Sequence, residues 1–284
     1  MIIKKILRHF IYYLPTNFAI DCSINYIRYV YKNKTIYVRQ KTFNGELLKL
    51  KCSNDISSLE RKITSDKELV KYFIAGVIGS KYNVPTIGIC RSKSELKELR
   101  LTFPCVIKST HASGDVRFLE SYDDLNSNEL EKWLSNDYYR HCRERNYKDL
   151  TPKLIIEPIL FGNRNVEDIK FFCVNGKVKL IQVDFDRHSD HTRKFYDSEW
   201  SDLNSSIGYP LSNKTKEKPA MLSQMKIAAS RLAEYFRFVR IDMYYDANSE
   251  KFYVGEITHC HGGAGEQFIP RECSVKVNAI LFGE

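Results

Sequence analysis

Two pairs of apolar segments, each joined by a short polar turn, constrain the fold of this chain most. In the first pair, DIKFFCV and KVKLIQVDF flank Asn175 and Gly176. Asn-Gly is a preferred two-residue connection of a β-hairpin, because both residues tolerate a positive φ. In the second pair, FVRIDMYY and KFYVGEIT flank the polar run DANSE. The patterns therefore predict two antiparallel hairpins.

Helical patterns alternate with further strand patterns along the chain. Ser65 and Glu68 have the spacing of a capping box, and apolar residues then recur at helical period as far as Ile78. We expect a helix of about four turns there, a short one over 92–99, and a long one that begins near Pro219. Strands are expected at FPCVIK, VRFLE and KLIIEPIL. This mixture predicts an α+β fold rather than a doubly wound parallel sheet.

Composition narrows the class of protein. The 284 residues are 43% hydrophobic and 28% charged, which excludes a wholly disordered or fibrous chain. The net charge of +9 favours an anionic partner, which includes nucleic acid, phosphates, uronic acids and an anionic membrane surface. No uncharged apolar run reaches the roughly 18 residues of a membrane span, and the apolar start lacks a signal-cleavage site. Eight dispersed cysteines without a CxxC pair predict reduced thiols and a cytoplasmic location.

A carboxylate pair on the second hairpin is the first candidate site. If the turn is centred on Ser249, Asp242 and Glu256 face each other, with Arg240 and Thr258 on the same face. Two facing carboxylates repel each other unless a cation lies between them, and oxygen ligands suit Mg²⁺. The alternative is a solvated edge hairpin on which Arg240 or Lys251 neutralises the acids. The apolar flanking residues favour a central sheet, where unpaired carboxylates are costly.

A second candidate site is a small-residue loop after a buried strand. Lys108 ends FPCVIK, and the hydroxylated and small residues of 109–114 follow it. Backbone N–H groups of such a loop can approach an anion, although a loop of this composition is also a common turn. Asp168 and Lys170 alternate onto one face of the strand DIKFFCV. They are either ligand-binding residues or an ion pair on an exposed strand face.

Taken in order, these pieces resemble the ATP-grasp superfamily of ligases. The matching segments are SDKELVKYFI, VPT, FPCVIK, LIIEPIL, DIKFFCVNGKV and VRIDMYY with VGEIT, within residues 65 to 268. The sequence is most similar to the branch named for teichuronopeptide biosynthesis, which has a DxKF strand, an FYDxxW segment (195–200 here), an RxD strand and a GExT ending.

This resemblance implies the ATP-grasp fold, in which two α+β lobes sandwich ATP. We expect a small N-terminal lobe over 1–64, a small ATP-grasp lobe with the phosphate-binding loop over 65–156, and a large lobe with the metal site over 157–284.

The resemblance also implies roles for individual residues. The catalytic residues would be Arg240, Lys108 and Lys170. The nucleotide would be bound through its phosphates, adenine and ribose by Lys67, Lys108, His111, Ser113, Gly114, Glu157, Pro158, Ile159, Leu160, Asp168 and Lys170. Asp242, Glu256 and Thr258 would bind Mg²⁺. Thr258 departs from the superfamily, which usually has Asn at this position.

The implied reaction is phosphorylation of a carboxylate by ATP, followed by attack of an amine to form an amide. The resembling family suggests a uronic acid of a bacterial surface polysaccharide, or a lipid-linked sugar precursor, as the acid, and an amino acid or amine as its partner. We assign the acceptor pocket to Asp186, Arg187, Arg193, Lys194 and His261. Arg187 is preferred for the carboxylate, because arginine binds that group through two parallel hydrogen bonds.

Simpler interpretations stay open for some of these residues. His188 and His191 fit a solvated loop, and His259, Cys260 and His261 follow each other too closely to converge on one metal ion. The basic residues Lys4, Lys5, Arg8, Lys32 and Lys34 would be drawn to an anionic glycan or to the inner face of a membrane.

Two other functions compete with the ligase. One is a glycosyltransferase that uses a sugar diphosphate, and the other is a non-catalytic module that binds nucleotides or nucleic acid. The dispersed basic residues and the lack of a known nucleic-acid motif argue against nucleic acid as a partner. The sequence leaves the oligomeric state open.

Overall fold

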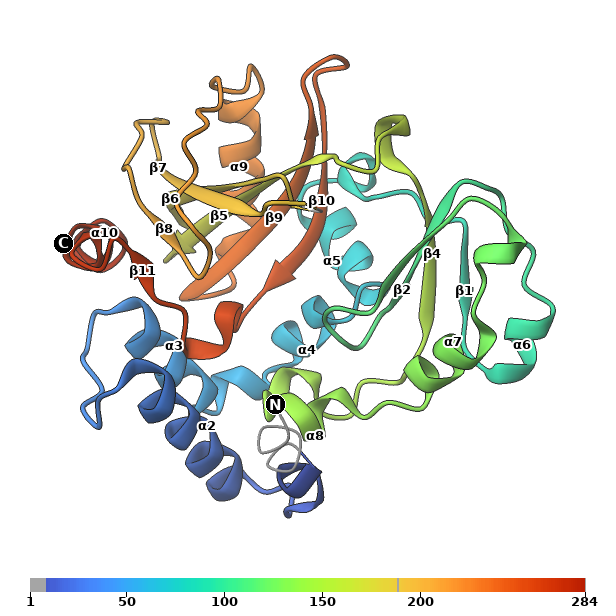
Figure 1. Ribbon diagram of the computed structural model, residues 1–284, viewed down its shortest axis with the longest axis horizontal. Helices are drawn as coiled ribbons and strands as arrows, with labels where there is room; N and C mark the ends of the chain where they lie inside the picture. The colour runs from blue at the N-terminus through green and yellow to red at the C-terminus, as the bar shows by residue number, and fades with distance from the viewer. Residues whose placement is uncertain (1–8, 188, 284) are drawn as a thin grey trace.

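The computed structural model describes residues 9–187 and 189–283, which fold around two antiparallel sheets (Figure 1). The larger sheet has the strand order β10-β9-β5-β6-β7 and the smaller one β1-β4-β2-β3. A third sheet contains only β8 (Ser206–Ile207) and β11 (Phe268–Ile269). All ladders within the three sheets are antiparallel, so the expected α+β class is confirmed.

The larger sheet contains both predicted hairpins. Its strands are β5 (Glu167–Val174), β6 (Lys177–Phe185), β7 (Thr192–Asp197), β9 (Phe238–Asp246) and β10 (Lys251–Thr258). Asn175 and Gly176 connect β5 to β6 with φ values of 49° and 72°, as a two-residue hairpin turn requires.

Helices cover both faces of the larger sheet. Phe171 and Phe172 are neighbours on β5 and therefore point to opposite faces. Phe171 belongs to a core with α5 (Leu69–Val77) and α9 (Leu222–Ala233). Phe172 belongs to a second core with α2 (Phe18–Asn33), α3 (Phe43–Lys51) and α10 (Cys273–Phe282). The sheet is thus buried on both sides.

The helices that pack on the smaller sheet cover only one of its two faces. Its strands are β1 (Gly88–Cys90), β2 (Cys105–Ser109), β3 (Val116–Leu119) and β4 (Leu154–Pro158). Ile107 and Ile156 pack with α6 (Lys93–Lys97) and α7 (Ser127–Leu134). Lys108 and Glu157, one residue further along β2 and β4, therefore point to the opposite face. The charged face of this sheet is the one left for the candidate site.

The predicted capping box at Ser65 is wrong. Ser65 is the last residue of α4 (Leu59–Ser65), and α5 has nine residues, so it is shorter than the expected four turns. The cap is supplied by Asp66, whose Oδ1 accepts the backbone N–H groups of Glu68 at 2.8 Å and Leu69 at 3.0 Å. Asp66 is buried, and Thr110 Oγ1 donates to its Oδ2 at 2.9 Å, which fixes the carboxylate in the capping position.

A further helix, α8 (Tyr138–Cys142), lies against the chain around Tyr12, since Arg140 donates to the carbonyl oxygen of Tyr12 at 3.4 Å and the rings of His141 and Tyr12 are in contact (Figure 1). In the part of the chain that the structure describes, no helix is both long enough and apolar enough to cross a bilayer.

Candidate active site between the two sheets

The β9–β10 hairpin brings together the predicted metal ligands. Asp242 is paired with Glu256 and Arg240 with Thr258, as a turn centred on Ser249 predicts. The turn itself has another register, because Lys251 pairs with Asp246 and a bulge follows Val254. The bulged residue is Gly255, on which a Cβ atom would lie 2.6 Å from the ring of Tyr244. Glycine is therefore required where the bulge approaches this ring.

The apolar residues of the hairpin predicted a central position in the sheet, but the hairpin lies at the edge of the sheet. β10 is an edge strand. Its edge is covered by the segment after α5, since Asn83 forms a bridge with Val254 and the ring of Tyr82 stacks on Phe252 at 4.9 Å. The covered edge explains why the strand is apolar although it has a neighbouring strand on one side only.

Arg240 neutralises Asp242, as the alternative interpretation required, but it does so inside the protein. Its Nε and Nη2 atoms donate to Asp242 Oδ1 and Oδ2, each at 2.6 Å, and the carboxylate is buried. Lys170, opposite Asp242 on β5, has its Nζ 3.6 Å from the same carboxylate. Burial raises the pKa of Asp242 to about 6, against the opposing effect of Arg240 and Lys170.

Glu256 has a different environment. Thr258 Oγ1 donates to its Oε1 at 2.9 Å, and Arg240 Nη2 lies 3.8 Å from the same oxygen. Burial alone would raise the pKa of Glu256, but Lys67 and Arg240 lower it to about 2. The side chain is nevertheless 45% exposed, so it can reach a ligand.

The oxygen donors of this pair fit a Mg²⁺ ion. Two carboxylates and a hydroxyl are the ligand types that Mg²⁺ prefers, and the ion usually completes its shell with water and phosphate oxygens. Across 9–187 and 189–283, no three His, Cys, Asp or Glu side chains are grouped closely enough to hold a metal ion. A bound Mg²⁺ would therefore depend on a phosphate ligand as well as on Asp242 and Glu256.

Two lysines and a glutamate form a cluster at the smaller sheet: Lys108 is on β2, Glu157 is on β4, and Lys71 is on α5. Glu157 Oε2 accepts from Lys108 Nζ at 2.7 Å, and its Oε1 accepts from Lys71 Nζ at 2.6 Å. Burial would raise the pKa of Glu157, but the two lysines lower it below its ordinary value. Sequence reasoning missed Lys71, although it follows Lys67 by four residues in a helical pattern, the spacing of residues on one helix face.

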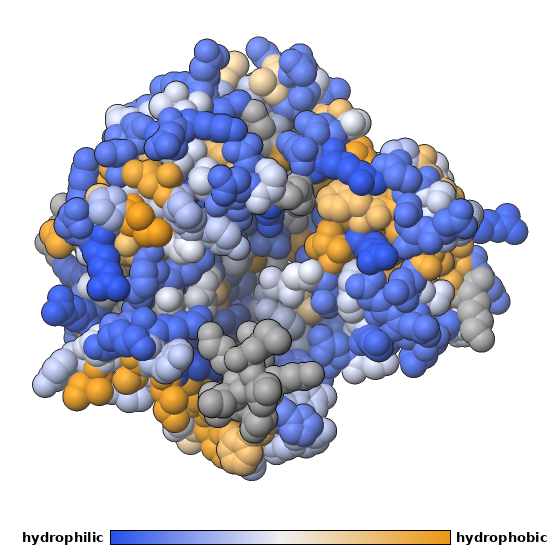
Figure 2. Space-filling view, in the orientation of Figure 1, coloured by the Kyte–Doolittle hydropathy of each residue, from blue (hydrophilic) through white to orange (hydrophobic). Residues whose placement is uncertain are grey.

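Contacts across the molecule join this cluster to the large sheet. Lys108 Nζ lies 5.7 Å from the ring centre of Tyr244 on β9. Lys67 is close enough to Glu256 for the carboxylate to raise its pKa, although burial has the larger effect and lowers it. Figure 2 shows that the surface is hollowed between the two parts of the molecule that carry these residues. The charged faces of the two sheets therefore border one space.

The predicted phosphate loop is anchored at its base and exposed at its tip. Lys67 donates to the loop twice, from its backbone N–H to Thr110 O at 3.1 Å and from Nζ to Ala112 O at 2.5 Å. His111 is buried and bonds Asn136 O through Nε2 at 3.1 Å. Ser113 and Gly114 are exposed, and Gly114 has a φ of 96°. The tip is free to approach an anion in the hollow.

The predicted adenine hinge follows β4, where the chain passes toward the larger sheet. Pro158, Ile159 and Leu160 are half-buried. Phe161, with a positive φ of 54°, stacks on Tyr253 of β10 at 5.5 Å. The stacking holds this segment next to the hairpin that carries the carboxylate pair.

Asp168 and Lys170 form an ion pair, and both residues are buried rather than exposed. Lys170 Nζ also lies 3.4 Å from Asp184, which accepts from Arg193 Nε at 2.9 Å. Arg187 Nη1 donates to Asp168 at 2.6 Å. Burial would raise the pKa of Asp184, but Lys170 and Arg193 lower it to about 2. Arg187, Arg193 and the acids they hold thus continue the site beyond Lys170.

The other predicted acceptor residues lie elsewhere. Lys194 follows Arg193 on β7 and so points to the opposite face, where it pairs with Asp202 at 2.9 Å. Asp186 pairs with the exposed Lys214 at 2.6 Å.

The predicted histidine of the acceptor pocket is part of the core. His261 is buried against the rings of Phe43, Phe172 and Phe238, and burial holds its pKa well below the ordinary value. His188 lies outside the described residues, whereas His191 lies beside the candidate site, with its Nε2 3.6 Å from Asp184 and its ring centre 3.9 Å from that of Tyr209.

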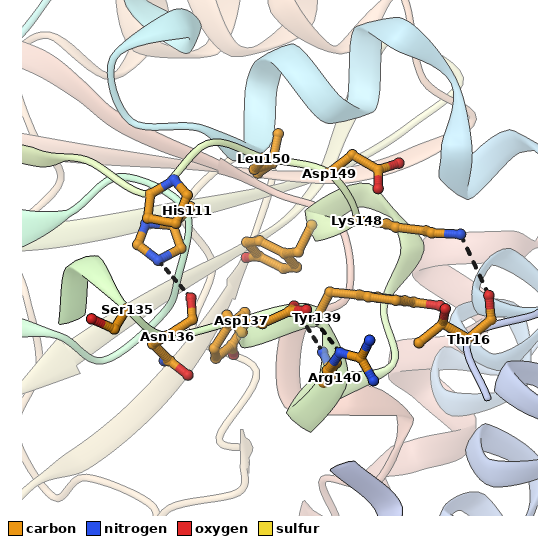
Figure 3. A pocket seen from close by; sticks show the side chains of 13 residues that line it. Thr16, His111, Ser135, Asn136, Asp137, Tyr139, Arg140, Lys148, Asp149 and Leu150 are labelled. Atoms are coloured by element: carbon orange, nitrogen blue, oxygen red, sulfur yellow. Dashed lines mark hydrogen bonds and ion pairs between the residues drawn. The ribbon is translucent and has the colours of Figure 1, made fainter. Parts of the chain in front are cut away.

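A cavity of about 310 Å³ lies beside the phosphate loop (Figure 3). His111 and Asn136 are on one side of it, and Arg140 and Lys148 are on the other. Tyr138 and Tyr147, whose rings meet edge to face at 4.9 Å, also line it. The cavity is polar and aromatic, and no sequence pattern indicated it because its residues are scattered between Thr16 and Pro152.

Comparison with solved structures gives matches of low sequence identity. D-alanine–D-alanine ligase from Bacillus anthracis, complexed with ATP, is 18% identical, with a TM-score of 0.41 over 70% of this chain and 56% of that one. L-amino acid ligase from Bacillus licheniformis is 16% identical, with a TM-score of 0.47 over 77% and 49%. The ATP-grasp ligase PsnB, complexed with minimal precursor, is 10% identical, with a TM-score of 0.43 over 74% and 56%. This chain thus spans about half the length of each protein.

A search among curated proteins finds no match. A family model, in contrast, matches most of the chain. The model of the TupA-like ATP-grasp family matches residues 46–280, which include every strand of the three sheets and all the candidate ligands described above. The match confirms the resemblance seen in the sequence, and the chain belongs to the TupA-like ATP-grasp family.

Proposed function

We propose that this protein is an ATP- and Mg²⁺-dependent ligase that joins a carboxylate to an amine and releases ADP. The observation that carries the proposal is the arrangement of charge around the space between the sheets. Lys67 and Lys108 on one side provide cations for phosphate, and Asp242 and Glu256 on the other provide oxygens for Mg²⁺. Family membership supports the same conclusion.

In the first step, an oxygen of the acid attacks the γ-phosphorus of ATP, and the bond from that phosphorus to the β,γ-bridging oxygen breaks. ADP leaves, and an acyl phosphate forms. The chain must align the two reactants and neutralise the charge on the transferred group. Lys67, Lys108 and Lys170 supply positive charge for this purpose. Mg²⁺ bound to Asp242 and Glu256, with Thr258 beside them, supplies further neutralisation.

In the second step, the amine attacks the acyl carbon, and the bond from that carbon to the phosphate oxygen breaks. Negative charge develops on the carbonyl oxygen as the amine adds. Arg240 is the nearest cation to the carboxylate pair, and it would stabilise this charge through its guanidinium N–H groups. Inorganic phosphate and a proton leave with the amide product.

The nucleoside would be held where β4 ends. The backbone of 157–160 would bind the adenine edge, and the stacked rings of Phe161 and Tyr253 support that segment. Asp168 Oδ1 is buried and has no hydrogen-bond partner in the described part of the chain. An acceptor of this kind suits a ribose hydroxyl, because a buried carboxylate oxygen without a partner is costly.

We propose a uronic acid of a surface glycan, or of its lipid-linked precursor, as the acid, and an amino acid or amine as its partner. The positive net charge supports an anionic acceptor. Arg187 is the proposed carboxylate-binding residue, since its side chain is 52% exposed and already holds a carboxylate, that of Asp168. An ATP-dependent reaction also fits the cytoplasmic location that the reduced cysteines predict.

The proposal is tested by incubating the protein with ATP, Mg²⁺, an amine mixture and a uronate-bearing oligosaccharide. We expect ADP and an amide product. AMP in place of ADP would exclude the acyl phosphate, and stabilisation by UDP-sugars but not by ATP would favour a glycosyltransferase. Arg187→Ala should weaken acceptor binding, whereas an effect of Arg140→Ala alone would place the acceptor in the cavity of Figure 3.

A further inference from the structure

The helix α2 packs on the core through Ile24 and Tyr29, but the same inner face also buries two polar side chains, and the outer face exposes apolar ones. Asp21 and Asn25 are 0% and 2% exposed, whereas Ile27 and Tyr31 are 64% and 63% exposed. Ile27 and Tyr31 lie one turn apart on the same face of the helix. The outer face of a helix on the surface of a globular protein is ordinarily polar. The outer face of α2 is therefore built for contact with something other than water.

Buried polar contacts fix α2 in this orientation. Arg143, which is fully buried, pairs with Asp21 at 3.2 Å, and Tyr139 donates to the same carboxylate at 2.5 Å. Asn25 Nδ2 donates to the backbone carbonyl of Arg143 at 2.8 Å. Turning the apolar face inward would break these bonds and leave a buried charge without its partner, which costs about 3–5 kcal/mol.

The loop after α2 enlarges the apolar surface. Tyr26 Oη donates to the carbonyl oxygen of Ile36 at 2.7 Å, which holds the loop against the helix. Ile36 and Tyr37 are 62% and 73% exposed. Figure 2 shows hydrophobic side chains along the lower edge of the molecule, over α2 and this loop in Figure 1. We call Tyr26, Ile27, Tyr31, Ile36 and Tyr37 the α2 patch.

The sequence around the α2 patch is strongly basic. Residues 1–45 contain eight Lys and Arg residues and a single acid, Asp21, so this stretch supplies seven of the nine net positive charges. Asp21 is buried in its ion pair, so it does not offset the surface charge. Lys34 lies 4.6 Å over the ring of Tyr31, and Arg39 is exposed nearby. Lys4, Lys5 and Arg8 lie outside the described residues.

We propose that the α2 patch docks on an anionic lipid surface. Tyrosine is enriched where proteins meet lipid headgroups, and exposed apolar residues with surrounding Lys and Arg are typical of helices that lie in that interface. Each basic residue near an anionic surface contributes about fivefold to binding. A second copy of the chain is a poorer occupant, because it would bring two strongly positive surfaces together. This proposal goes beyond the ligase reaction and does not depend on it.

Co-sedimentation with vesicles tests the proposal without nucleotide or substrate. We expect the protein to bind vesicles of phosphatidylcholine with about one-third phosphatidylglycerol, to bind pure phosphatidylcholine far less, and to dissociate at high salt. Ile27→Asp should lower partitioning at least about tenfold, because it removes an apolar group and adds an unfavourable charge. The matched control is Ile227→Asp, on the helix α9, where the isoleucine is 62% exposed.

Three outcomes would overturn the proposal. The first is equal binding to neutral and anionic vesicles, or no binding to either. The second is an equal loss of binding in Ile27→Asp and Ile227→Asp. The third is a wild-type dimer in analytical ultracentrifugation that Ile27→Asp dissociates, because the occupant would then be a second copy. Circular dichroism and ATP titration of each variant separate these outcomes from unfolding and from failure of the ligase proposal.

Discussion

Each of three buried carboxylates around the candidate site is held by a cation of its own. Arg240 holds Asp242, Lys108 and Lys71 share Glu157, and Arg193 holds Asp184. Removing one member of a buried pair leaves the other charge without its partner, which is more costly than the pair is stabilising. Substitutions here are therefore expected to change both stability and ligand binding, and controls must separate the two effects.

Lys108→Met keeps most of the aliphatic side chain and removes the charge. We expect the affinity for ATP with Mg²⁺ to fall by about tenfold or more, since a charged hydrogen bond to phosphate is lost. The free energy of unfolding should fall by only about 1–3 kcal/mol, because Lys71 still holds Glu157. Calorimetric titration and urea unfolding measure the two quantities.

The matched control for this substitution is Lys226→Met, since Lys226 pairs with the exposed Glu199 far from the site. It should change neither quantity by much. An unchanged nucleotide affinity in Lys108→Met would mean that Lys108 serves the fold and not the nucleotide.

Asp184 predicts a pH dependence of stability. Its pKa falls from 3.8 to about 2 in the folded protein, so its ionised form stabilises the fold above pH about 4, and this contribution is lost as the pH falls toward 2. Asp184→Asn should therefore cost about 2 kcal/mol at pH 7. Urea unfolding should show this difference from the wild type shrinking between pH 5 and pH 3. A difference that stays constant over this range would contradict the assigned ion pairs.

At the scale of secondary-structure elements, the bulge on β10 sets the geometry of the site. It shifts the register between the turn and the site, so that Glu256 faces Asp242 although the turn is not centred on Ser249. It also brings the backbone of Gly255 against Tyr244, the ring that lies beneath Lys108. The side chain of Tyr244 thus couples the hairpin to the smaller sheet.

Gly255→Ala should displace Tyr244, because the new Cβ atom would lie 2.6 Å from the ring. We expect the free energy of unfolding to fall by about 1–3 kcal/mol, the usual effect of overpacking. Nucleotide affinity should fall as well. Gly76→Ala is the control, since a Cβ atom there meets nothing within 4 Å. Equal effects of the two substitutions on nucleotide affinity would show that the bulge does not position the site.

The attachment of α2 rests on the buried pair of Asp21 and Arg143. Asp21→Ala should lower the free energy of unfolding by about 3–5 kcal/mol, because Arg143 stays buried without its main partner. Asp137→Ala removes an exposed Asp–Arg pair and the N-cap of the neighbouring helix α8, and should cost about 1 kcal/mol. Similar losses in the two variants, measured by urea unfolding, would contradict this account of how α2 is held.

Local sequence signals predicted the two hairpins and the facing of the carboxylate pair at the candidate site. Asn175-Gly176 marks its turn because few other residue pairs tolerate its φ values. The facing of Asp242 and Glu256 follows from strand alternation. The capping residue was missed because Ser65 and Asp66 are both suitable, and the contacts that fix Asp66 come from Thr110 and Lys153, far away in the chain. Lys71 and Tyr244 were missed because their roles arise from packing between the sheets, which no local pattern records.

At the scale of the whole molecule, the two sheets and their adjoining segments place lysines and carboxylates on either side of one space, and we propose that ATP with Mg²⁺ binds there. The claim depends on both sheets, since neither carries the complete set of charges. Lys108 is on β2 of the smaller sheet, and Lys67, which precedes α5, is hydrogen-bonded to the loop after β2; Asp242 and Glu256 are on the larger sheet.

Calorimetric titration of ATP into the wild type and Glu256→Gln, each with Mg²⁺ and with EDTA, tests this claim most directly. Glu250→Gln, in the exposed turn of the same hairpin, is the control. We predict that the wild type and Glu250→Gln bind ATP with Mg²⁺, and that both EDTA and Glu256→Gln weaken binding by about tenfold or more. Wild-type affinity that is the same with Mg²⁺ and with EDTA, or that Glu256→Gln leaves unchanged, would contradict the account.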